Sequence, residues 1–414
     1  MDPATPLERD LRIILAIQSL RAFGYGFASV VLGTALAAGG LSDGQVGLVF
    51  AAILAGNAVV SIGVGLTGDR IGRRRVYTVL LCVMTAAGVA YAFSDSLAVL
   101  IVVALTGTLS TDANESGPLT SLEQAMMGGA GPDVRARVFG RYNAVAYLAG
   151  AVGALAGGGP ALIRERIPTL PTDQRWLLVL ALAGAGCVAL TRRLSPAIDE
   201  RAGRVARPLQ RSRSEVSRLA ALFGLDAFAG GFVVSTFLVF WFGRRFGASA
   251  ELMGLVLFCS GLLQAASSIA SGRLATRFGL LPTMVFTHLP SNVVLILIPA
   301  MPTLGAAIAT LLLRSTLSQM DVPARQAYVS ALVAPEERTA AAAFTNTARY
   351  VVRPFGAAGA GLVMQTIAVG APFVVAGALK SAYDVLLFVR FRRVPLPQEH
   401  ASGRGAPGEP TPRG

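Results

Sequence analysis

Among the charged side chains inside long apolar segments of this chain, seven are the least easily explained as structural. Four are arginines and three are carboxylates: Arg21, Arg314, Arg349, Arg353, Asp112, Glu115 and Asp226. A charge at the centre of a lipid bilayer costs about 2.5–3.5 kcal/mol on insertion scales, so those that persist usually face a cavity or an opposite charge. Arginine binds carboxylates and phosphates through a planar fork of donors. The surplus of arginine therefore favours an anionic or zwitterionic ligand.

The candidates for binding that ligand are the four arginines and two uncharged neighbours. Tyr25 follows Arg21 by one helical turn, and Asn114 lies between Asp112 and Glu115. A structural explanation stands beside this one, because buried ion pairs add little net stability and their presence alone proves no function. The structural explanation is the simpler one for two pairs of opposite charges that lie four residues apart on one helix. We expect Asp321 to neutralise Arg325, and Lys380 to neutralise Asp384.

The three carboxylates are also the candidates for carrying a proton. Burial disfavours the charged form of a carboxyl group, so a carboxylate in an apolar segment takes up a proton more readily than one in water. Asp112, Glu115 and Asp226 are therefore the predicted proton-coupling residues. His288 is a candidate relay, although a lone histidine on an apolar face is more often structural.

A charged turn separates two of the apolar segments and recurs later in the chain. It is predicted to form a conformational latch made of Gly65, Asp69, Arg70, Gly72 and Arg73. Small residues let helices approach closely, glycine permits a tight turn, and a carboxylate there can accept hydrogen bonds from an arginine or a helix N-terminus. The alternative is a basic loop that only fixes orientation, but such a loop would not need Asp69. A second copy begins 207 residues later (272 − 65 = 207), with Thr276 in place of the acid.

The elements that must hold these residues are membrane-spanning helices. The chain is 53% hydrophobic and only 14% charged, whereas soluble domains carry about 25% charged residues. A span needs about 20 apolar residues. The sequence predicts twelve spans, near 11–38, 45–68, 76–94, 97–127, 136–160, 175–192, 218–242, 250–272, 280–300, 303–330, 339–366 and 371–391.

The arginines lie mostly in alternate loops, which by the positive-inside rule places both termini in the cytoplasm. This bias also explains the formal net charge of +13, so we expect no nucleic-acid partner. The predicted organisation is a cytoplasmic N-terminus (1–10), a first six-helix bundle (11–192), a cytoplasmic linker (193–217), a second six-helix bundle (218–391) and a disordered cytoplasmic tail (392–414). The lipid bilayer of the cell membrane is the expected surrounding.

The repetition and the charged turn together resemble the major facilitator superfamily, in its bacterial type. The signature of that family in the turn after its second span is similar to Gly65-x-x-x-Asp69-Arg70-x-Gly72-Arg73-Arg74 here. Residues of 132–153 also match 335–356 at an offset of 203 (335 − 132 = 203). The resemblance implies an all-α integral membrane fold of twelve transmembrane helices in two six-helix pseudo-repeats, N-in and C-in, with spans 1, 4, 7 and 10 around a central cavity. Thr67 and Thr276 depart from the family pattern. Because Thr276 replaces the acid, we expect the second copy of the turn to lack the charged contacts of the conformational latch.

The resemblance also implies secondary active transport of a small solute by alternating access, coupled to protons and, by analogy, directed outward as in an antiporter. An anionic or zwitterionic substrate is favoured by the arginines. Two alternatives remain open: multidrug-type efflux of apolar or cationic compounds, and a non-transporting membrane receptor or scaffold on the same fold. The chain has no P-loop or H-E-x-x-H signature, so we expect no cofactor, no metal and no enzymatic activity. A monomer is expected.

Overall fold

The computed structural model describes residues 6–94, 96–110, 117–127, 132–169, 171, 174–200, 210, 212–334 and 337–394. Within these ranges the regular elements are helices. The first set comprises α1 (Pro6–Ala38), α2 (Asp43–Ile71), α3 (Arg73–Phe93), α4 (Leu97–Ala104), α5 (Pro118–Met127), α6 (Pro132–Gly157), α7 (Gly159–Arg166), α8 (Leu178–Thr191) and α9 (Ala197–Glu200). The second set comprises α10 (Arg213–Gly231), α11 (Ser235–Phe246), α12 (Ala250–Phe278), α13 (Leu280–Leu297), α14 (Leu304–Ser315), α15 (Asp321–Leu332), α16 (Arg338–Thr366) and α17 (Ala371–Phe391).

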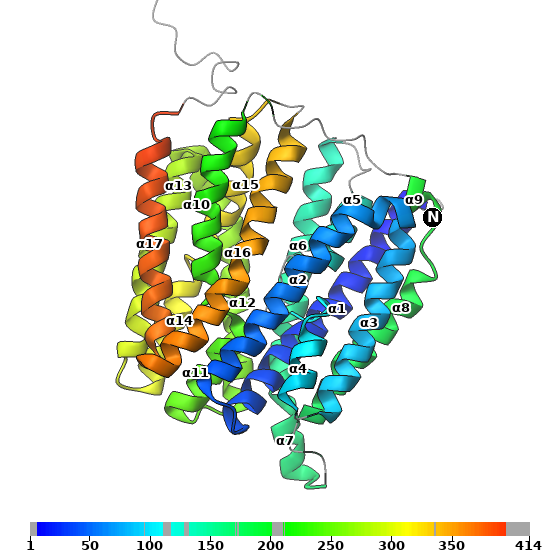
Figure 1. Cartoon of the computed structure of the whole chain (residues 1–414), viewed down its shortest axis with the longest axis vertical. Coiled ribbons are helices and arrows are strands. Elements are labelled where there is room, and N and C mark those ends of the chain that lie inside the picture. The colour runs from blue at the N-terminus through cyan, green and yellow to red at the C-terminus, as the bar shows by residue number, and fades with distance from the viewer. Residues whose placement is uncertain are drawn as a thin grey trace, which may run out of the picture.

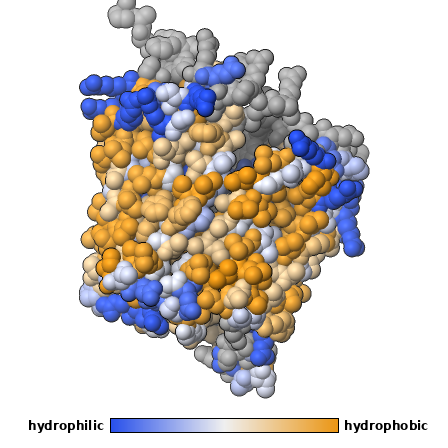
Figure 2. Space-filling model, viewed as in Figure 1, coloured by the Kyte–Doolittle hydropathy of each residue, from blue (hydrophilic) through white to orange (hydrophobic). Residues whose placement is uncertain are grey.

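These helices form two bundles that stand side by side (Figure 1). α1 begins and α17 ends at the same end of the molecule, which we call the terminal end. Hydrophobic side chains form a belt around the middle of the visible face, and hydrophilic ones gather toward both ends (Figure 2). Large apolar side chains are exposed on the membrane-length helices, including Val59 at 68%, Leu182 at 71% and Ile269 at 72%. An apolar surface of this extent is stable only against lipid, and the chain is a multi-pass membrane protein.

Nine helical segments of the described chain are long and apolar enough to cross a membrane. They coincide with nine of the twelve predicted spans. The remaining three predicted spans coincide with α4 and α5, with α14 and α15, and with α16. The first two are interrupted, and α16 is continuous but carries Arg349 and Arg353. The all-helical membrane class is therefore confirmed, while a total of twelve crossings stays a prediction.

Three of the predicted spans are interrupted: 97–127, 218–242 and 303–330. Pro118 is the first residue of α5, as the sequence Gly117-Pro118 leads one to expect, because proline is tolerated at a helix start. Interrupted helices leave backbone groups that must be satisfied within the protein. The hydroxyl of Tyr25 donates to the Thr108 carbonyl at 2.7 Å, and the Asn57 amide donates to the Leu109 carbonyl at 2.8 Å. Tyr25 therefore supports the break after α4.

The two halves repeat the same local geometry at the offsets found in the sequence. Gly72 and Gly279, 207 residues apart, both adopt positive φ, at 100° and 90°. A Cβ added to Gly153 would lie 2.0 Å from the Phe23 carbonyl oxygen, and one added to Gly356 would lie 1.9 Å from that of Phe228. Each pair joins the first helix of a half to its fifth predicted span. Only glycine allows this approach.

Glycines also close the bundle at the end opposite the termini, where the turn between α1 and α2 lies (Figure 1). A Cβ on Gly47 in α2 would lie 2.3 Å from the Gly361 Cα in α16. One on Gly33 in α1 would lie 2.6 Å from the Val239 Cβ in α11. The two halves are therefore packed backbone to backbone at this end, which we call the closed end.

The linker predicted at 193–217 is partly built into the first bundle. α9 lies within it, and Leu194 and Ile198 are 2% and 0% exposed. The side chain of Asp10 accepts hydrogen bonds from the Ser195 backbone N–H at 3.0 Å and from its hydroxyl at 2.6 Å. The start of the linker and the start of α1 thus hold each other, rather than forming free polar segments. α1 itself begins at Pro6, inside the segment predicted as an N-terminal extension.

Candidate functional site

A polar cavity of about 650 Å³ lies between the two halves. The first half contributes uncharged lining residues: Thr120, Gln124, Tyr142, Asn143 and Tyr147. The second half contributes all the charged lining residues of the described chain, together with one histidine: Asp226, His288, Arg314, Asp321, Arg325, Arg349, Arg353 and Lys380. The Tyr147 hydroxyl donates to the Gln319 side-chain carbonyl at 3.2 Å and bridges the halves.

Asp226 in α10 is the centre of the charged wall. Its side chain is 4% exposed and contacts cations from three other helices. Lys380 Nζ in α17 lies 2.6 Å from Oδ1, Arg349 in α16 lies 3.0 Å from Oδ2, and Arg325 in α15 lies 3.3 Å from the same oxygen. Contacts of this kind are charge-assisted and therefore strong. Asp226 thus draws four helices of the second half together.

Arg325 also contacts Asp321 at 3.1 Å, so the predicted pair on α15 is confirmed. The predicted pairing of Lys380 with Asp384 is wrong. Lys380 reaches Asp226, whereas the Asp384 carboxylate contacts His288 Nδ1 at 2.9 Å and accepts from the Asn292 amide at 2.9 Å. The two residues lie one turn apart on α17, but each serves a different partner because neighbouring helices offer better geometry than the shared helix.

Cationic side chains predominate in the described lining. Five of them line the cavity together with two carboxylates. Arg349 remains 24% exposed to the cavity although it contacts Asp226. A positive, partly enclosed surface raises the local concentration of anions. This cavity can therefore hold a small anion or the acidic group of a larger solute.

A second buried charge cluster lies in the first half, behind the cavity wall. Arg21 in α1 contacts the Glu123 carboxylate in α5 at 2.6 Å, and their side chains are 3% and 0% exposed. The Tyr77 hydroxyl donates to Glu123 at 2.5 Å, and the Tyr142 hydroxyl donates to its other oxygen. Arg21 also donates to Thr120 at 3.2 Å. This cluster is closed and neutral, and Arg21 is not among the described residues that line the cavity.

Arg21 and Asp226 occupy equivalent places in the two halves. The offset between α1 and α10 is 205, as the close contacts of Gly26 and Gly231 show (231 − 26 = 205). The same offset carries Arg21 onto Asp226 (226 − 21 = 205). Each half therefore has one charge at the same depth of its first helix, with opposite signs.

The cavity is lined by four of the predicted site residues: Asp226, Arg314, Arg349 and Arg353. Tyr25 is 4% exposed and supports the backbone, as described above. The predicted residues Asp112, Asn114 and Glu115 lie outside the described residues.

The charged turn after α2 is tied to the linker. The Arg74 backbone N–H donates to the Asp199 carboxylate at 3.0 Å, so an acid from α9 caps the start of α3. The buried Arg73 guanidinium donates to the Ala125 carbonyl at 2.9 Å. Gly72 has the positive φ expected of it. A Cβ on Gly65 would meet no described atom within 4 Å, so no described helix packs closely against this glycine. Arg70 is exposed, and the side chain of Asp69 lies outside the description.

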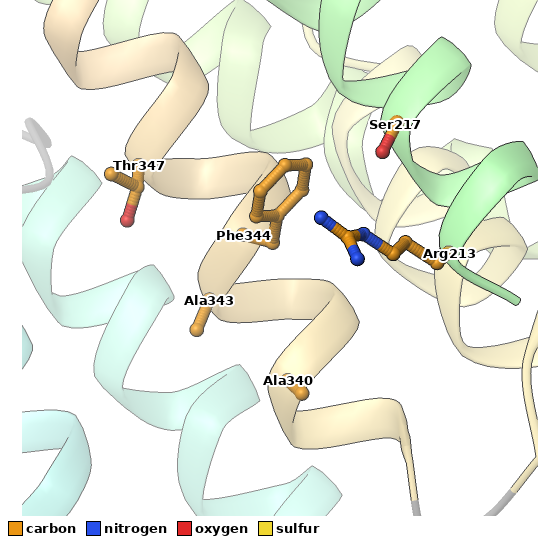
Figure 3. A pocket seen from close by; sticks show the side chains of 6 residues that line it. All are labelled: Arg213, Ser217, Ala340, Ala343, Phe344 and Thr347. Carbon is orange, nitrogen blue, oxygen red and sulfur yellow. The ribbon is translucent and has the colours of Figure 1, made fainter. Parts of the chain in front are cut away.

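A shallow groove on the outer face of the second half is separate from the cavity. Arg213 from α10 points toward the Phe344 ring of α16, with Ser217 and Thr347 beside them (Figure 3). The groove continues along an apolar strip between the same helices. A binding site for a small solute needs several polar groups that converge on it. This groove offers one cation and an apolar wall, whereas the central cavity offers many polar groups.

Two residues of these clusters are not among the predicted site residues. Glu123 is fully buried against Arg21. The only sequence signal for it is its position six residues after Gly117, where the helix is broken. Lys380 is predicted to pair with Asp384, although it is the single lysine of the chain and lies in a predominantly apolar helix.

Comparisons with known proteins agree with this architecture. The profile of the Major Facilitator Superfamily matches residues 219–413. An uncharacterized membrane protein of Saccharomyces cerevisiae is 25% identical over 421 residues, covering 92% of this chain and 94% of the yeast protein. It gives no support to a bacterial-type assignment.

Two solved structures share the fold. The nucleoside transporter NupG has a TM-score of 0.73 at 12% identity, covering 92% of this chain and 100% of NupG. The human organic anion transporter MFSD10 has a TM-score of 0.64 at 18% identity, covering 93% and 100%. At these identities they establish the fold alone. The second half of the chain thus matches the Major Facilitator Superfamily profile, and the whole chain shares its fold with these transporters.

Proposed function

We propose that this protein moves a small organic anion across the membrane by alternating access, and that the basic cavity between its halves is the binding site. The observation that carries this proposal is the convergence of five cationic side chains on the cavity from four helices of the second half, α14 to α17. MFSD10, which shares the fold, is described as an organic anion transporter. That description supports the proposal only weakly, because NupG shares the fold as closely and is described as a nucleoside transporter.

Asp226 acts as an internal substitute for the substrate anion. Its carboxylate holds Arg349 and Arg325 when the cavity is empty, at 3.0 and 3.3 Å. An incoming carboxylate or sulfonate competes for the same guanidinium groups. One unit charge about 4 Å from another is worth roughly 4 kcal/mol at an effective dielectric constant of 20. An anion at this distance from Arg349 therefore competes with Asp226 on comparable terms.

Alternating access requires that the halves separate at one end while they close at the other. The glycine contacts at Gly47, Gly361 and Gly33 close the end opposite the termini, and the cavity lies between that end and the terminal end. The Tyr147–Gln319 hydrogen bond joins the halves across the cavity and would break during the movement. We expect twelve spans with both termini in the cytoplasm, so that this conformation opens inward. Outward transport and the coupling ion remain predictions.

Efflux of lipophilic cations is less consistent with the lining. A cation site needs aromatic faces or unpaired carboxylates, and the described lining has three aromatic rings, Tyr142, Tyr147 and Phe223, against five cations. A receptor or scaffold on the same fold would bind the anion without moving it. Flux through reconstituted protein separates these alternatives.

The test uses four matched aromatic probes: benzoate, benzenesulfonate, neutral benzamide and cationic benzyltrimethylammonium. Binding is measured on purified protein by thermal stabilisation and calorimetry. We expect the two anions to bind and the neutral and cationic probes to fail. Arg349→Gln and Arg353→Gln should weaken anion binding about tenfold or more, because a hydrogen bond to a charged group contributes about 1.5–3 kcal/mol. Arg390→Gln, an exposed arginine at the end of α17, is the control.

Proteoliposomes loaded with radiolabelled benzenesulfonate then report transport. Movement of the anion that stops in Arg349→Gln supports the proposal. Binding without movement identifies a receptor. Binding of benzyltrimethylammonium in preference to benzenesulfonate, or anion affinities unchanged in both arginine variants, overturns the assignment of an anion site.

A further inference from the structure

Three buried polar side chains next to the cavity have no part in holding an anion. His288 in α13 is 5% exposed, Asn292 lies one turn further along, and Asp384 in α17 faces both. Asn292 and Asp384 are 0% and 1% exposed. Asp384 is not among the described residues that line the cavity, whereas His288 is. The histidine therefore lies between the cavity and a carboxylate buried behind it.

The imidazole of His288 lies between two carboxylates. Nδ1 is 2.9 Å from Asp384 Oδ1, and Nε2 is 4.0 Å from Asp226 Oδ1. A contact of 2.9 Å between a ring nitrogen and a carboxylate oxygen requires a hydrogen between them. A neutral imidazole has one N–H, so when Nδ1 donates to Asp384 the Nε2 lone pair faces Asp226. The lone pair and the Asp226 carboxylate repel each other. A second proton, bound at Nε2, makes the ring positive, and the ring then attracts Asp226.

The charged and titratable groups around His288 determine how favourable this second proton is. The group on α10 is Asp226, and those on α17 are Lys380, Tyr383 and Asp384. On α15 and α16 they are Asp321, Arg325 and Arg349. Arg314 approaches the cavity from α14. The Tyr383 ring packs edge-on against the imidazole, with centroids 6.0 Å apart. Among the described residues in contact around Asp226 and His288, the carboxylates are Asp226, Asp321 and Asp384, and the cations are Arg325, Arg349 and Lys380. These charges balance when Nε2 carries no proton.

We infer that His288, held by Asp384, is the proton-binding site that couples this transporter to the pH gradient. This inference rests on the proposed anion transport. Nε2 takes a proton from the cavity and returns it to the cavity, so no bond other than N–H forms or breaks. Asp384 holds the Nδ1–H tautomer and stabilises the imidazolium, which makes it a positioning residue. Asn292 fixes the second oxygen of Asp384 through its amide.

The proton and the anion favour each other's binding. A proton on His288 adds one positive charge to a cluster that adjoins the anion cavity, and it gives Asp226 a new partner in place of Arg349. Reciprocity then requires that the anion raise the affinity for the proton by the same factor that the proton raises the affinity for the anion. Ligands that bind together move together, so the site predicts symport of anion and proton instead of the expected antiport.

The first experiment observes the proton directly and needs no substrate. The chain has two histidines, His288 and His400, so His400→Gln leaves one imidazole to observe. Protein labelled with ¹⁵N-histidine is reconstituted in lipid bilayers and examined by solid-state NMR from pH 5 to pH 9. We expect an Nδ1–H tautomer at high pH that converts to a doubly protonated ring at low pH. In Asp384→Asn the Nδ1–H tautomer should lose part of its preference at high pH, because a carboxylate is a stronger acceptor for this N–H than an amide oxygen.

An imidazole that keeps one protonation state throughout this range overturns the proton site, and so does a tautomer ratio unchanged in Asp384→Asn. The same spectra test whether either variant folds, since a misfolded protein gives a solvent-exposed histidine signal. Asn292→Asp offers a second variant. It adds a carboxylate next to Nδ1 and should keep the Nδ1–H tautomer.

The second experiment measures coupling with benzenesulfonate, whose own charge is constant over this range. Its affinity in wild-type protein should be at least about tenfold higher at pH 6 than at pH 8, within the usual range of coupling between sites. In His288→Gln this pH dependence should disappear while the anion still binds. In His400→Gln it should persist. If His288→Gln keeps the full pH dependence, the inference fails and the anion site stands. If no anion binds at any pH while the imidazole titrates as expected, the proposed function fails and the proton site stands.

Discussion

The buried pair of Arg21 and Glu123 gives the sharpest prediction about stability. Both side chains are almost fully removed from solvent, at 3% and 0% exposure. Breaking a buried ion pair by removing one partner costs about 3–5 kcal/mol, because the remaining charge is left without compensation. Glu123→Gln should therefore lower the free energy of unfolding by this amount. Arg21→Gln should cost less, since a carboxylate can take up a proton but a guanidinium cannot lose one.

The double variant Arg21→Gln/Glu123→Gln should recover much of the loss. Two neutral amides still offer partners to the Tyr77 and Tyr142 hydroxyls, which donate to Glu123 in the native protein. We expect the cycle of four proteins to give an interaction free energy of about 2–3 kcal/mol, within the range found for residues in one network. Reversible unfolding by sodium dodecyl sulfate in mixed micelles measures each free energy.

The outcome also separates a structural Arg21 from a substrate-binding one. If Arg21 only balances Glu123, the double variant should bind benzenesulfonate with an affinity close to that of the wild type. A double variant that is stable but binds no benzenesulfonate would show that Arg21 belongs to the binding site. It would refute the assignment of Arg21 as a purely structural residue. A Glu123→Gln protein within about 1 kcal/mol of the wild type would refute the claim that the pair is desolvated.

Three further predictions concern the ends of the bundle. Asp69→Asn should slow transport severely while Thr276→Ala has a mild effect, as measured by flux in proteoliposomes, because only the first copy of the turn retains its acid. Asp199→Ala should lower the free energy of unfolding by about 1 kcal/mol, since it removes the cap at the start of α3. Gly361→Val should separate the halves at the closed end and increase amide hydrogen exchange in α2 beside it, whereas Gly305→Val, whose Cβ would meet nothing within 4 Å, should not.

The sequence predicted the elements better than the partners. Span positions follow from hydropathy, because lipid imposes a length of apolar chain that can be counted directly. The positive φ of Gly72 and Gly279 follows from the repeat. Ion pairs could not be assigned in the same way. Spacing along one helix suggested that Lys380 binds Asp384, but the choice depends on which side chains neighbouring helices bring near, and this is a tertiary property.

The limits of spacing are clearest at Glu123 and Tyr25. Both lie in or beside predicted cavity helices, and both could be read as residues that face the solute. Tyr25 instead donates to a carbonyl freed by the break after α4, and Glu123 neutralises Arg21. A backbone break inside the membrane and a buried charge each demand a partner, and nearby polar side chains meet that demand before they are available to a ligand.

The two halves place a buried charge at the same depth in opposite ways, and this difference explains why the charged lining among the described residues comes from the second half. Arg21 and Asp226 lie at equivalent depths of α1 and α10. In the first half the central charge has one acidic partner and is sealed by two tyrosines and a threonine. In the second half the central charge is a carboxylate shared by three cations, and these cations also face the cavity. Asp226 shares Arg325 with Asp321, and all three cations also line the space between the halves, where a solute can reach them. A chain with a duplicated fold can thus keep one half as a rigid support while the other half binds the solute.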